Sequence, residues 1–349
     1  MSGGQLSPRT PPDVTALMRE YGDLTRQALL DFLPDREPRR YLYDLIGDYP
    51  RRSSRCMRPA ICIASARAHG ASIEQAIHSA VSIELLHNAL LVVDDIQDGS
   101  VERRGRPTLH ELHGIPVALN VGSTMSILSL VPLFRNVQAC GPFLAQWVFE
   151  RAIEVAQQCA EGQALELGWR LDNKCDVTME DYLDMVLRKT CSYSVMYPMR
   201  IGAMIGLRAP DVPESILRYA FLIGAAFQIQ DDLLNVAGDH GRYGKELLGD
   251  LLEGKRTLLT IGLLERADER EASFVRTVFH KPREQKTQAE AEQILALMKK
   301  YDCLERTRAI AQGLIGAALQ AFSIDLEKLP ASRDKEFLRG LSTWVVEQP

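Results

Sequence analysis

Apolar residues recur three and four positions apart along most of the chain, the spacing that places side chains on one face of an α-helix. Alternating patterns typical of half-buried strands are almost absent. Five long segments are predicted to be helices: residues 13–33, 72–93, 141–171, 178–207 and 213–236. Several of them are apolar on more than one face, so we expect these to lie centrally in a bundle. The sequence therefore predicts an all-α fold, a single large helical bundle.

Local signals indicate where the helices begin and where the chain turns. Ser72 and Thr178 each precede a helical pattern with an acidic residue close behind, as in a capping box. Breaks are predicted at residues 48–54, 238–244 and 280–292. Helical periodicity resumes on both sides of residues 280–290, which therefore fit an exposed connector. We expect one domain over residues 14–349, preceded by a disordered, polar and proline-rich tail over residues 1–13, which lacks the apolar core of a signal peptide.

The composition narrows the class of protein. The 349 residues are 46% hydrophobic and 25% charged, as in a soluble globular protein. A net charge of −5 provides no basic field to attract nucleic acid, so anionic ligands must be held by local basic clusters. We expect no membrane span, because we find no run of about 20 apolar residues. Seven widely spaced cysteines without a C-x-x-C pair indicate reduced thiols in a cytoplasmic protein.

Two acidic motifs, "DDIQD" and "DDLLN", end two of the most apolar helical segments. Within each motif the first and last residues are four positions apart and so share a helix face. Basic residues follow both motifs within a few turns. The candidate metal ligands are Asp94, Asp95, Asp98, Asp231, Asp232 and Asn235.

One such motif alone would more often be a solvated helix end, since short motifs match by chance. Two copies, each directly after an apolar helix, favour a metal site instead. Mg²⁺ takes one or two carboxylates together with waters and phosphate oxygens. The sequence has no EF-hand loop, and its single Glu-x-x-His pair, Glu84 and His87, cannot build a di-iron site.

An ordered series of motifs resembles the all-trans isoprenyl (polyprenyl) diphosphate synthases from about residue 40 to 320. The series includes "ELLHNALLVVDDIQDGSVERRGRPTLH", "GIPVALNVGS", "EGQALEL", "RKT", "FQIQDDLLN" and "YGKELLGDLLEGKRTLL". The likeness is greatest to bacterial geranylgeranyl diphosphate synthases. It implies a bundle around a central apolar cavity and, as in most of these enzymes, a homodimer.

The resemblance also assigns roles. Asp94, Asp98 and Asp231 would hold three Mg²⁺ ions on an allylic prenyl diphosphate. Thr190 and Gln228 would turn oxygens towards the developing carbocation. The cations that would neutralise the allylic diphosphate are Arg103, Lys189, Lys245 and Lys255. The second substrate, isopentenyl diphosphate, would bind at Arg55, Arg58, His87 and Arg104.

Several residues depart from the usual family pattern: Ser54 and Arg55 in place of Gly-Lys, Val93, Ser123, and Asn235 at the end of the second motif. Asn235 is discounted, because this variant often accompanies "YGKE" in the resembling enzymes. The other departures leave three interpretations, of which chain elongation is favoured. The second is a class I terpene cyclase on the same fold, which would not need Arg55, Arg58 and His87, so these residues would be free to change. The third is a non-catalytic regulatory subunit, which would tolerate loss of the carboxylates.

The positions just before the first acidic motif bear on product length. Ala89 and Leu90 lie about one turn from Asp94 and are predicted to line the tunnel that receives the growing tail. Neither is aromatic, so we expect a deeper floor, near Leu86 or Ser126, and a product of C20 or longer, with C20 favoured. Arg51 and Arg52 are interpreted as exposed surface charge.

Overall fold

A computed structural model describes residues 14–52, 54–238 and 246–347. Across these ranges the regular secondary structure is helical apart from one small hairpin, in which β1 (Glu102–Arg103) pairs antiparallel with β2 (Arg106–Pro107). The predicted all-α class is confirmed. The tail expected over residues 1–13 lies outside the described residues, and the single-domain division stays a prediction.

The helices follow one another with short connections. The first half of the chain contains α1 (Val14–Phe32), η1 (Arg39–Tyr43), α2 (Asp44–Ile46), α3 (Asp48–Arg51), α4 (Met57–Ala68), α5 (Ile73–Asp98), α6 (Leu109–His113), α7 (Ile115–Cys140) and α8 (Pro142–Leu171). The second half contains α9 (Met179–Val186), η2 (Leu187–Met196), α10 (Tyr197–Leu207), α11 (Glu214–Ala237), α13 (Gly249–Glu253), α14 (Leu258–Leu264), α15 (Glu269–His280), η3 (Arg283–Gln285), α16 (Gln288–Lys300), α17 (Cys303–Phe322), η4 (Leu326–Lys328) and α18 (Arg333–Val346).

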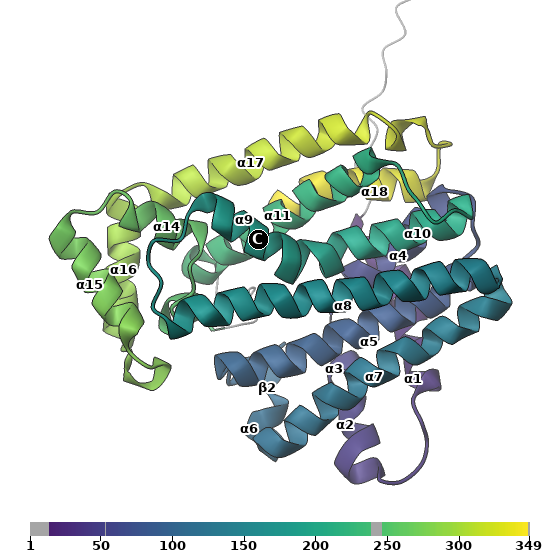
Figure 1. Cartoon of the computed structure of the whole chain (residues 1–349), viewed down its shortest axis with the longest axis horizontal. Helices are drawn as coiled ribbons and strands as arrows, with labels where there is room; N and C mark the ends of the chain where they lie inside the picture. Colours follow the sequence, from purple (N-terminus) through teal and green to yellow (C-terminus); the bar gives the residue numbers. More distant parts are fainter. Residues whose placement is uncertain (1–13, 53, 239–245, 348–349) are drawn as a thin grey trace, which may run out of the picture.

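The long helices lie roughly side by side (Figure 1). In this view α8 crosses the middle of the molecule, α5 and α7 lie below it, and α17 lies along the top. Helix α11 packs against α17 and η2, and α4 packs between α5 and α10. The short helices α14, α15 and α16 gather at one end. Helices α5, α8, α10 and α11, from segments that the sequence placed centrally, thus each pack against two or more other helices.

The structure confirms both predicted capping boxes. Ser72 and Gln75 cap α5, and Thr178 and Asp181 cap α9. The segment expected as one helix over residues 178–207 is helical from Met179 to Leu207 but passes through α9, the π-helical η2 and α10. The connector is shorter than expected, because α16 already begins at Gln288.

Two glycines allow neighbouring helices to approach η2 closely. A Cβ atom on Gly162 of α8 would lie 2.2 Å from the backbone nitrogen of Lys189, and one on Gly224 of α11 would lie 3.0 Å from Cys191 Cβ. The π-helical segment is therefore held between α8 and α11. Such segments often occur at functional sites, and this one carries Lys189 and Thr190.

Among the described residues, two helices have the length and mean hydropathy of membrane spans, so the expectation that no stretch is apolar enough was too strong. They are α5 and α7. In the most apolar 18-residue stretch of each helix, 67% of the residues of α5 and 39% of those of α7 are buried. Burial in the bundle accounts for α5, since core helices of soluble proteins have the same composition. Helix α7 differs because much of its apolar surface faces outwards.

Candidate active site

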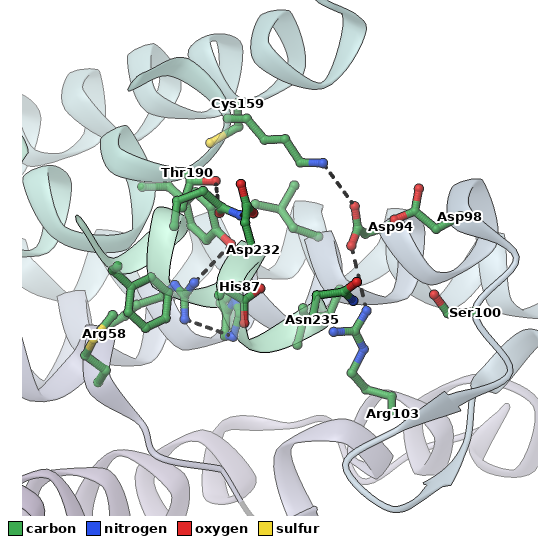
Figure 2. A pocket seen from close by; sticks show the side chains of 18 of the residues that line it. Arg58, His87, Asp94, Asp98, Ser100, Arg103, Cys159, Thr190, Asp232 and Asn235 are labelled. Carbon is green, nitrogen blue, oxygen red and sulfur yellow. Dashed lines mark hydrogen bonds and ion pairs between the residues drawn. The ribbon is translucent and has the colours of Figure 1, made fainter. Parts of the chain in front are cut away.

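A cavity of about 1480 Å³ lies between α5, α8, η2 and α11. Asp94 and Asp98 line it from α5, and Asp231 and Asp232 line it from α11. Figure 2 shows Asp94 and Asp98 on one side of this space and Asp232 on the helix opposite. The two acidic motifs, more than 130 positions apart in the sequence, therefore converge on one cavity as predicted.

Asp98 is almost fully buried between two cations. Its Oδ1 accepts from Arg170 at 2.7 Å and its Oδ2 accepts from Lys255 at 2.9 Å. Burial alone would raise the pKa of Asp98, but Lys255, Lys189 and Arg170 outweigh it and hold that pKa well below its usual value. The carboxylate is thus ionised, and it can bind a metal ion if Arg170 or Lys255 gives up one of its two oxygens.

Asp94 is the more accessible carboxylate of the first motif, with 27% of its side chain exposed. Lys189 Nζ lies 3.6 Å from its Oδ1 and donates to Glu166 at 2.6 Å. Arg103 lies 3.7 Å from its Oδ2. Asp94 therefore stands at the cavity surface between two cations that could also face a diphosphate.

Asp95 does not fit its predicted role as a metal ligand. It is fully buried and is absent from the cavity lining of the described residues. Tyr49 donates its hydroxyl to Asp95, and Arg103 Nε donates to it at 2.8 Å. Neighbouring helical residues point about 100° apart, so Asp95 faces away from Asp94 and instead fixes Arg103, which does line the cavity.

A hydrogen-bond chain joins the predicted carbocation-facing residues to the second motif. Thr190 Oγ1 donates to Gln228 Oε1 at 2.9 Å, and Gln228 Nε2 donates to Asp232 Oδ1 at 2.7 Å. Tyr182 donates to the other Asp232 oxygen at 2.7 Å. Burial, with the nearby Asp250, raises the pKa of Asp232 to about 8. Both Asp232 oxygens are already used within the chain, so Asp232 orients Gln228 more readily than it binds metal.

Asn235 is likewise engaged by the chain. Its Oδ1 accepts from the Asp250 amide at 3.1 Å, and its Nδ2 donates to the Glu246 carbonyl at 3.4 Å. It holds the segment that begins α13, and its predicted metal-binding oxygen is occupied. Lys245, predicted to bind diphosphate, lies outside the described residues.

A second basic cluster lies in the same cavity, as predicted for isopentenyl diphosphate. Arg58 contacts His87 Nε2 at 3.2 Å and donates to Tyr193 Oη at 3.1 Å and Ser194 Oγ at 2.7 Å. Since a guanidinium only donates, His87 accepts in this contact through Nε2.

The other two arginines of this cluster line the same cavity as Arg58. Arg104 lies in the β1–β2 hairpin and donates to the Tyr49 carbonyl at 2.9 Å, while Arg55 lies over the ring of Trp344. The interpretation of Arg52 as surface charge was wrong, because it is buried and donates to the carbonyls of Arg103 and Pro107.

The apolar wall differs from the predicted tunnel. Leu90 lines the cavity, but Ala89, Leu86 and Ser126 are not among the described residues that do. Ala89 is fully buried and packs with the α7 residue Val121. The opposite wall comes from α8, which contributes small side chains: Ala156, Cys159, Ala160 and Ala164.

Sequence reasoning missed four charged residues around the acidic motifs. Glu166 pairs with Lys189, and Arg170 pairs with Asp98. Lys255 lies 2.6 Å from Glu253 and 3.3 Å from Asp250. Glu166 stands in "EGQALEL" and Glu253 directly precedes "GK", so their place in the motifs was the available signal.

The donor atoms fit Mg²⁺ bound together with a diphosphate. Among the described residues, no three His, Cys, Asp or Glu side chains are close enough to hold an ion by themselves. Asp94, Asp98 and Asp231 instead present carboxylates from two walls of one cavity. Mg²⁺ commonly uses few protein ligands and completes its shell with phosphate oxygens and water.

Comparisons with known proteins agree with this geometry. A family model described as polyprenyl synthetase matches residues 39–298. A short chain isoprenyl diphosphate synthase from Methanothermobacter thermautotrophicus is 30% identical over 339 residues, covering 96% of this chain and 99% of the relative. The crystal structure of a geranylgeranyl pyrophosphate synthetase from Pyrococcus horikoshii is 29% identical with a TM-score of 0.84, covering 97% of this chain and 99% of that one.

A geranylgeranyl pyrophosphate synthase from Corynebacterium glutamicum, solved with isoprenyl diphosphate and magnesium, has a TM-score of 0.80. It is 21% identical, covering 97% of this chain and all of that one, and shows a common fold.

This chain belongs to the polyprenyl synthetase family. It is a prenyltransferase, and a terpene cyclase on the same fold is not favoured. A special likeness to bacterial enzymes is not supported, because the similar curated relatives include archaeal enzymes.

Proposed function

We propose that this chain condenses an allylic prenyl diphosphate with isopentenyl diphosphate in a Mg²⁺-dependent reaction and releases a product of C20 or longer, with C20 geranylgeranyl diphosphate favoured. One observation carries the proposal. A single cavity joins carboxylates from two helices, two separate groups of cations and an apolar wall. Chain elongation needs all of these together, since it binds two diphosphates and one hydrocarbon tail.

Asp94, Asp98 and Asp231 would hold Mg²⁺, with three ions expected alongside the allylic diphosphate. When bound, the metal supplies positive charge that stabilises the departing pyrophosphate. Lys189, Arg103 and Lys255 add to this charge at the cavity rim. Such contacts accelerate ionisation to the extent that they grow stronger as the carbon–oxygen bond breaks.

Lys255 would change partners when the allylic diphosphate binds. It now donates to Asp98, and it also lies close to Glu253 and Asp250. If Asp98 turns to a metal ion, Lys255 can turn to a phosphate oxygen while Glu253 still holds it. Lys255 is then not left as an unpaired buried charge, which would be costly.

Thr190 and Gln228 would stabilise the allylic cation. Thr190 Oγ1 lies on the cavity surface, and Gln228 is fixed in orientation by its bonds to Thr190 and Asp232. Oxygens held in place before the reaction stabilise developing positive charge without reorganising.

Arg58, Arg104, Arg55 and His87 would bind the diphosphate of isopentenyl diphosphate, where forked guanidinium contacts suit phosphate. The double bond of isopentenyl diphosphate attacks the allylic cation, and the released pyrophosphate takes the proton that is lost. The site therefore needs no separate basic side chain.

The test is incubation with Mg²⁺ and an allylic diphosphate, with and without isopentenyl diphosphate. Longer prenyl diphosphates formed only with the second substrate are the expected result. Hydrocarbons or alcohols formed without it would refute elongation and favour the cyclase. No turnover under either condition would favour the regulatory subunit.

The proposal includes a cytoplasmic homodimer joined through α7. Free cysteines support a reducing compartment. Ile115, Leu119, Ile127, Val131 and Phe134 are 41–68% exposed on the outer side of α7. A second copy would cover this apolar face. Phe134→Glu should convert the dimer to a monomer in light scattering, and a parent chain that is already monomeric would refute the dimer.

A further inference from the structure

Both arginines of "SRCMRP" lie over aromatic rings that come from distant parts of the chain. The guanidinium carbon of Arg58 lies 4.8 Å from the ring centre of Tyr193 in η2. That of Arg55 lies 5.5 Å from the ring centre of Trp344 in α18. All four side chains line the cavity. Each arginine is thus supported by an aromatic ring, and the two rings belong to residues 151 positions apart in the sequence.

The ring of Trp344 stands on a fixed helix. Phe337, Leu338 and Leu341 of α18 are at most 1% exposed, and Tyr219 of α11 donates to the Leu338 carbonyl. Helix α18 also packs along α4, which begins just after Arg55. The position of Trp344 is therefore set by the core and does not depend on the ligand.

The side chain of Arg55 is exposed. A neighbouring ring that restricts its movement would therefore help it to bind a ligand. An arginine side chain carries about 2 kcal/mol of rotamer entropy, part of which is lost when it binds phosphate. A flat ring restricts the guanidinium before the ligand arrives and lets its N–H groups point sideways. The carboxylate of Asp231 also acts electrostatically on Arg55, so an unsupported Arg55 could be drawn towards the metal-binding side.

We propose that Trp344 is a positioning residue for isopentenyl diphosphate, holding Arg55 so that its guanidinium faces the second diphosphate. The inference rests on the proposed function. It also explains why arginine stands at position 55: a guanidinium stacks flat on an indole ring, and a lysine ammonium cannot make the same stacked and forked contacts.

The test compares Trp344→Leu, Trp344→Phe and the control Trp147→Leu. Trp147 is partly buried and packs against the same core cluster as Trp344, but it is absent from the cavity lining of the described residues. We expect Trp344→Leu to raise KM for isopentenyl diphosphate about fivefold, the effect of one cation–π contact at an exposed site. KM for the allylic substrate and kcat should stay near the parent values, and Trp344→Phe should recover most of the loss.

A double-mutant cycle with Arg55→Met isolates the pair, because methionine carries no charge that could stay over the ring. If Trp344 acts through Arg55, adding Trp344→Leu to Arg55→Met should raise KM for isopentenyl diphosphate little further. Fully additive effects, or a Trp344→Leu value equal to that of Trp147→Leu, would overturn the inference. An equal rise of both KM values would do the same, since it would indicate a structural role. If the parent chain itself makes no longer prenyl diphosphate, the proposed function fails; if it does and Trp344→Leu matches it, only the role of Trp344 fails.

Discussion

Gly162 and Gly168 both lie inside α8 but have opposite surroundings, and they provide a sharp test of the site's architecture. A Cβ on Gly162 would lie 2.2 Å from the backbone nitrogen of Lys189 and 2.7 Å from its Cα. A Cβ on Gly168 would have no heavy atom within 4 Å. The same change, Gly→Ala, therefore meets a backbone at one position and open space at the other.

Two effects compete in these substitutions. Alanine is favoured over glycine inside a helix by about 1 kcal/mol. Overpacking costs about 1–3 kcal/mol, and more where the obstacle is backbone that cannot turn aside. Gly168→Ala should therefore stabilise the protein by up to about 1 kcal/mol. Gly162→Ala should destabilise the protein, because the free-energy cost of the overlap with Lys189 is larger than the gain in helix propensity.

The activity should separate the two variants further. To relieve the overlap, α8 and η2 must move apart, which displaces Lys189 and Thr190 together. Misplacement of catalytic groups by about 1 Å can cost on the order of a hundredfold in rate. We expect Gly162→Ala to lose tenfold or more in kcat, on the same principle, and Gly168→Ala to keep the parent value.

Thermal unfolding and steady-state kinetics on the pair check both expectations. The melting temperature should fall for Gly162→Ala and hold or rise for Gly168→Ala. Equal melting temperatures and equal kcat for the two variants would show that α8 does not press on η2, and the placement of Lys189 by Gly162 would be wrong.

Three further expectations concern metal binding, product length and pH. Asp94→Ala should reduce kcat by several orders of magnitude at saturating Mg²⁺, and near-normal turnover would contradict the metal assignment. Ala160→Phe should shorten the product seen by mass spectrometry, whereas Ala89→Phe should lower the melting temperature; shortening only by Ala89→Phe would refute α8 as the tunnel wall. Burial and nearby arginines lower the pKa of Lys286 to about 8. Between pH 8 and 10 the unfolded chain therefore binds more protons at this residue than the folded chain does. The contribution of Lys286 to the stability of the folded state rises with pH in that range. At pH 7 Lys286→Met should therefore melt at a higher temperature than the parent, and this difference should be smaller at pH 10. A difference that stays constant with pH would contradict the shifted pKa.

Helix geometry alone predicts part of the site and also corrects part of the sequence interpretation. Asp94 and Asp98 share a face because they are four residues apart, and the structure places both in the cavity. The same rule turns Asp95 about 100° away from Asp94. It turns Ala89 about 140° away, while Leu90 stays within about 40°. Leu90 lines the cavity and Ala89 does not, so a helical projection of the sequence is enough to separate these two residues.

Contacts between distant helices could not be predicted in this way. Arg170 reaches Asp98 across 72 positions, and Lys255 reaches it across 157. Their pairing depends on how α8 and the α13–α14 connection pack beside α5, which periodicity does not specify. Arg52 was misjudged for the same reason, because the carbonyls that bury it belong to a hairpin about 50 residues away.

The pattern of ion pairs around the cavity follows from the cost of burying charge. Arg103 is buried, Lys189 and Lys255 keep 20% and 18% of their side chains exposed, and each of the three has its own carboxylate: Asp95, Glu166 and Glu253. A buried cation without such a partner would be strongly unfavourable. Because each of these three cations keeps that partner, none of them is left unpaired if Asp94 and Asp98 turn to Mg²⁺, whereas Arg170 would give up its ion pair with Asp98. The carboxylates that pair with these cations thus leave Asp94 and Asp98 available for metal. Asp95, which lies outside the cavity, contributes by holding Arg103 at the cavity rim.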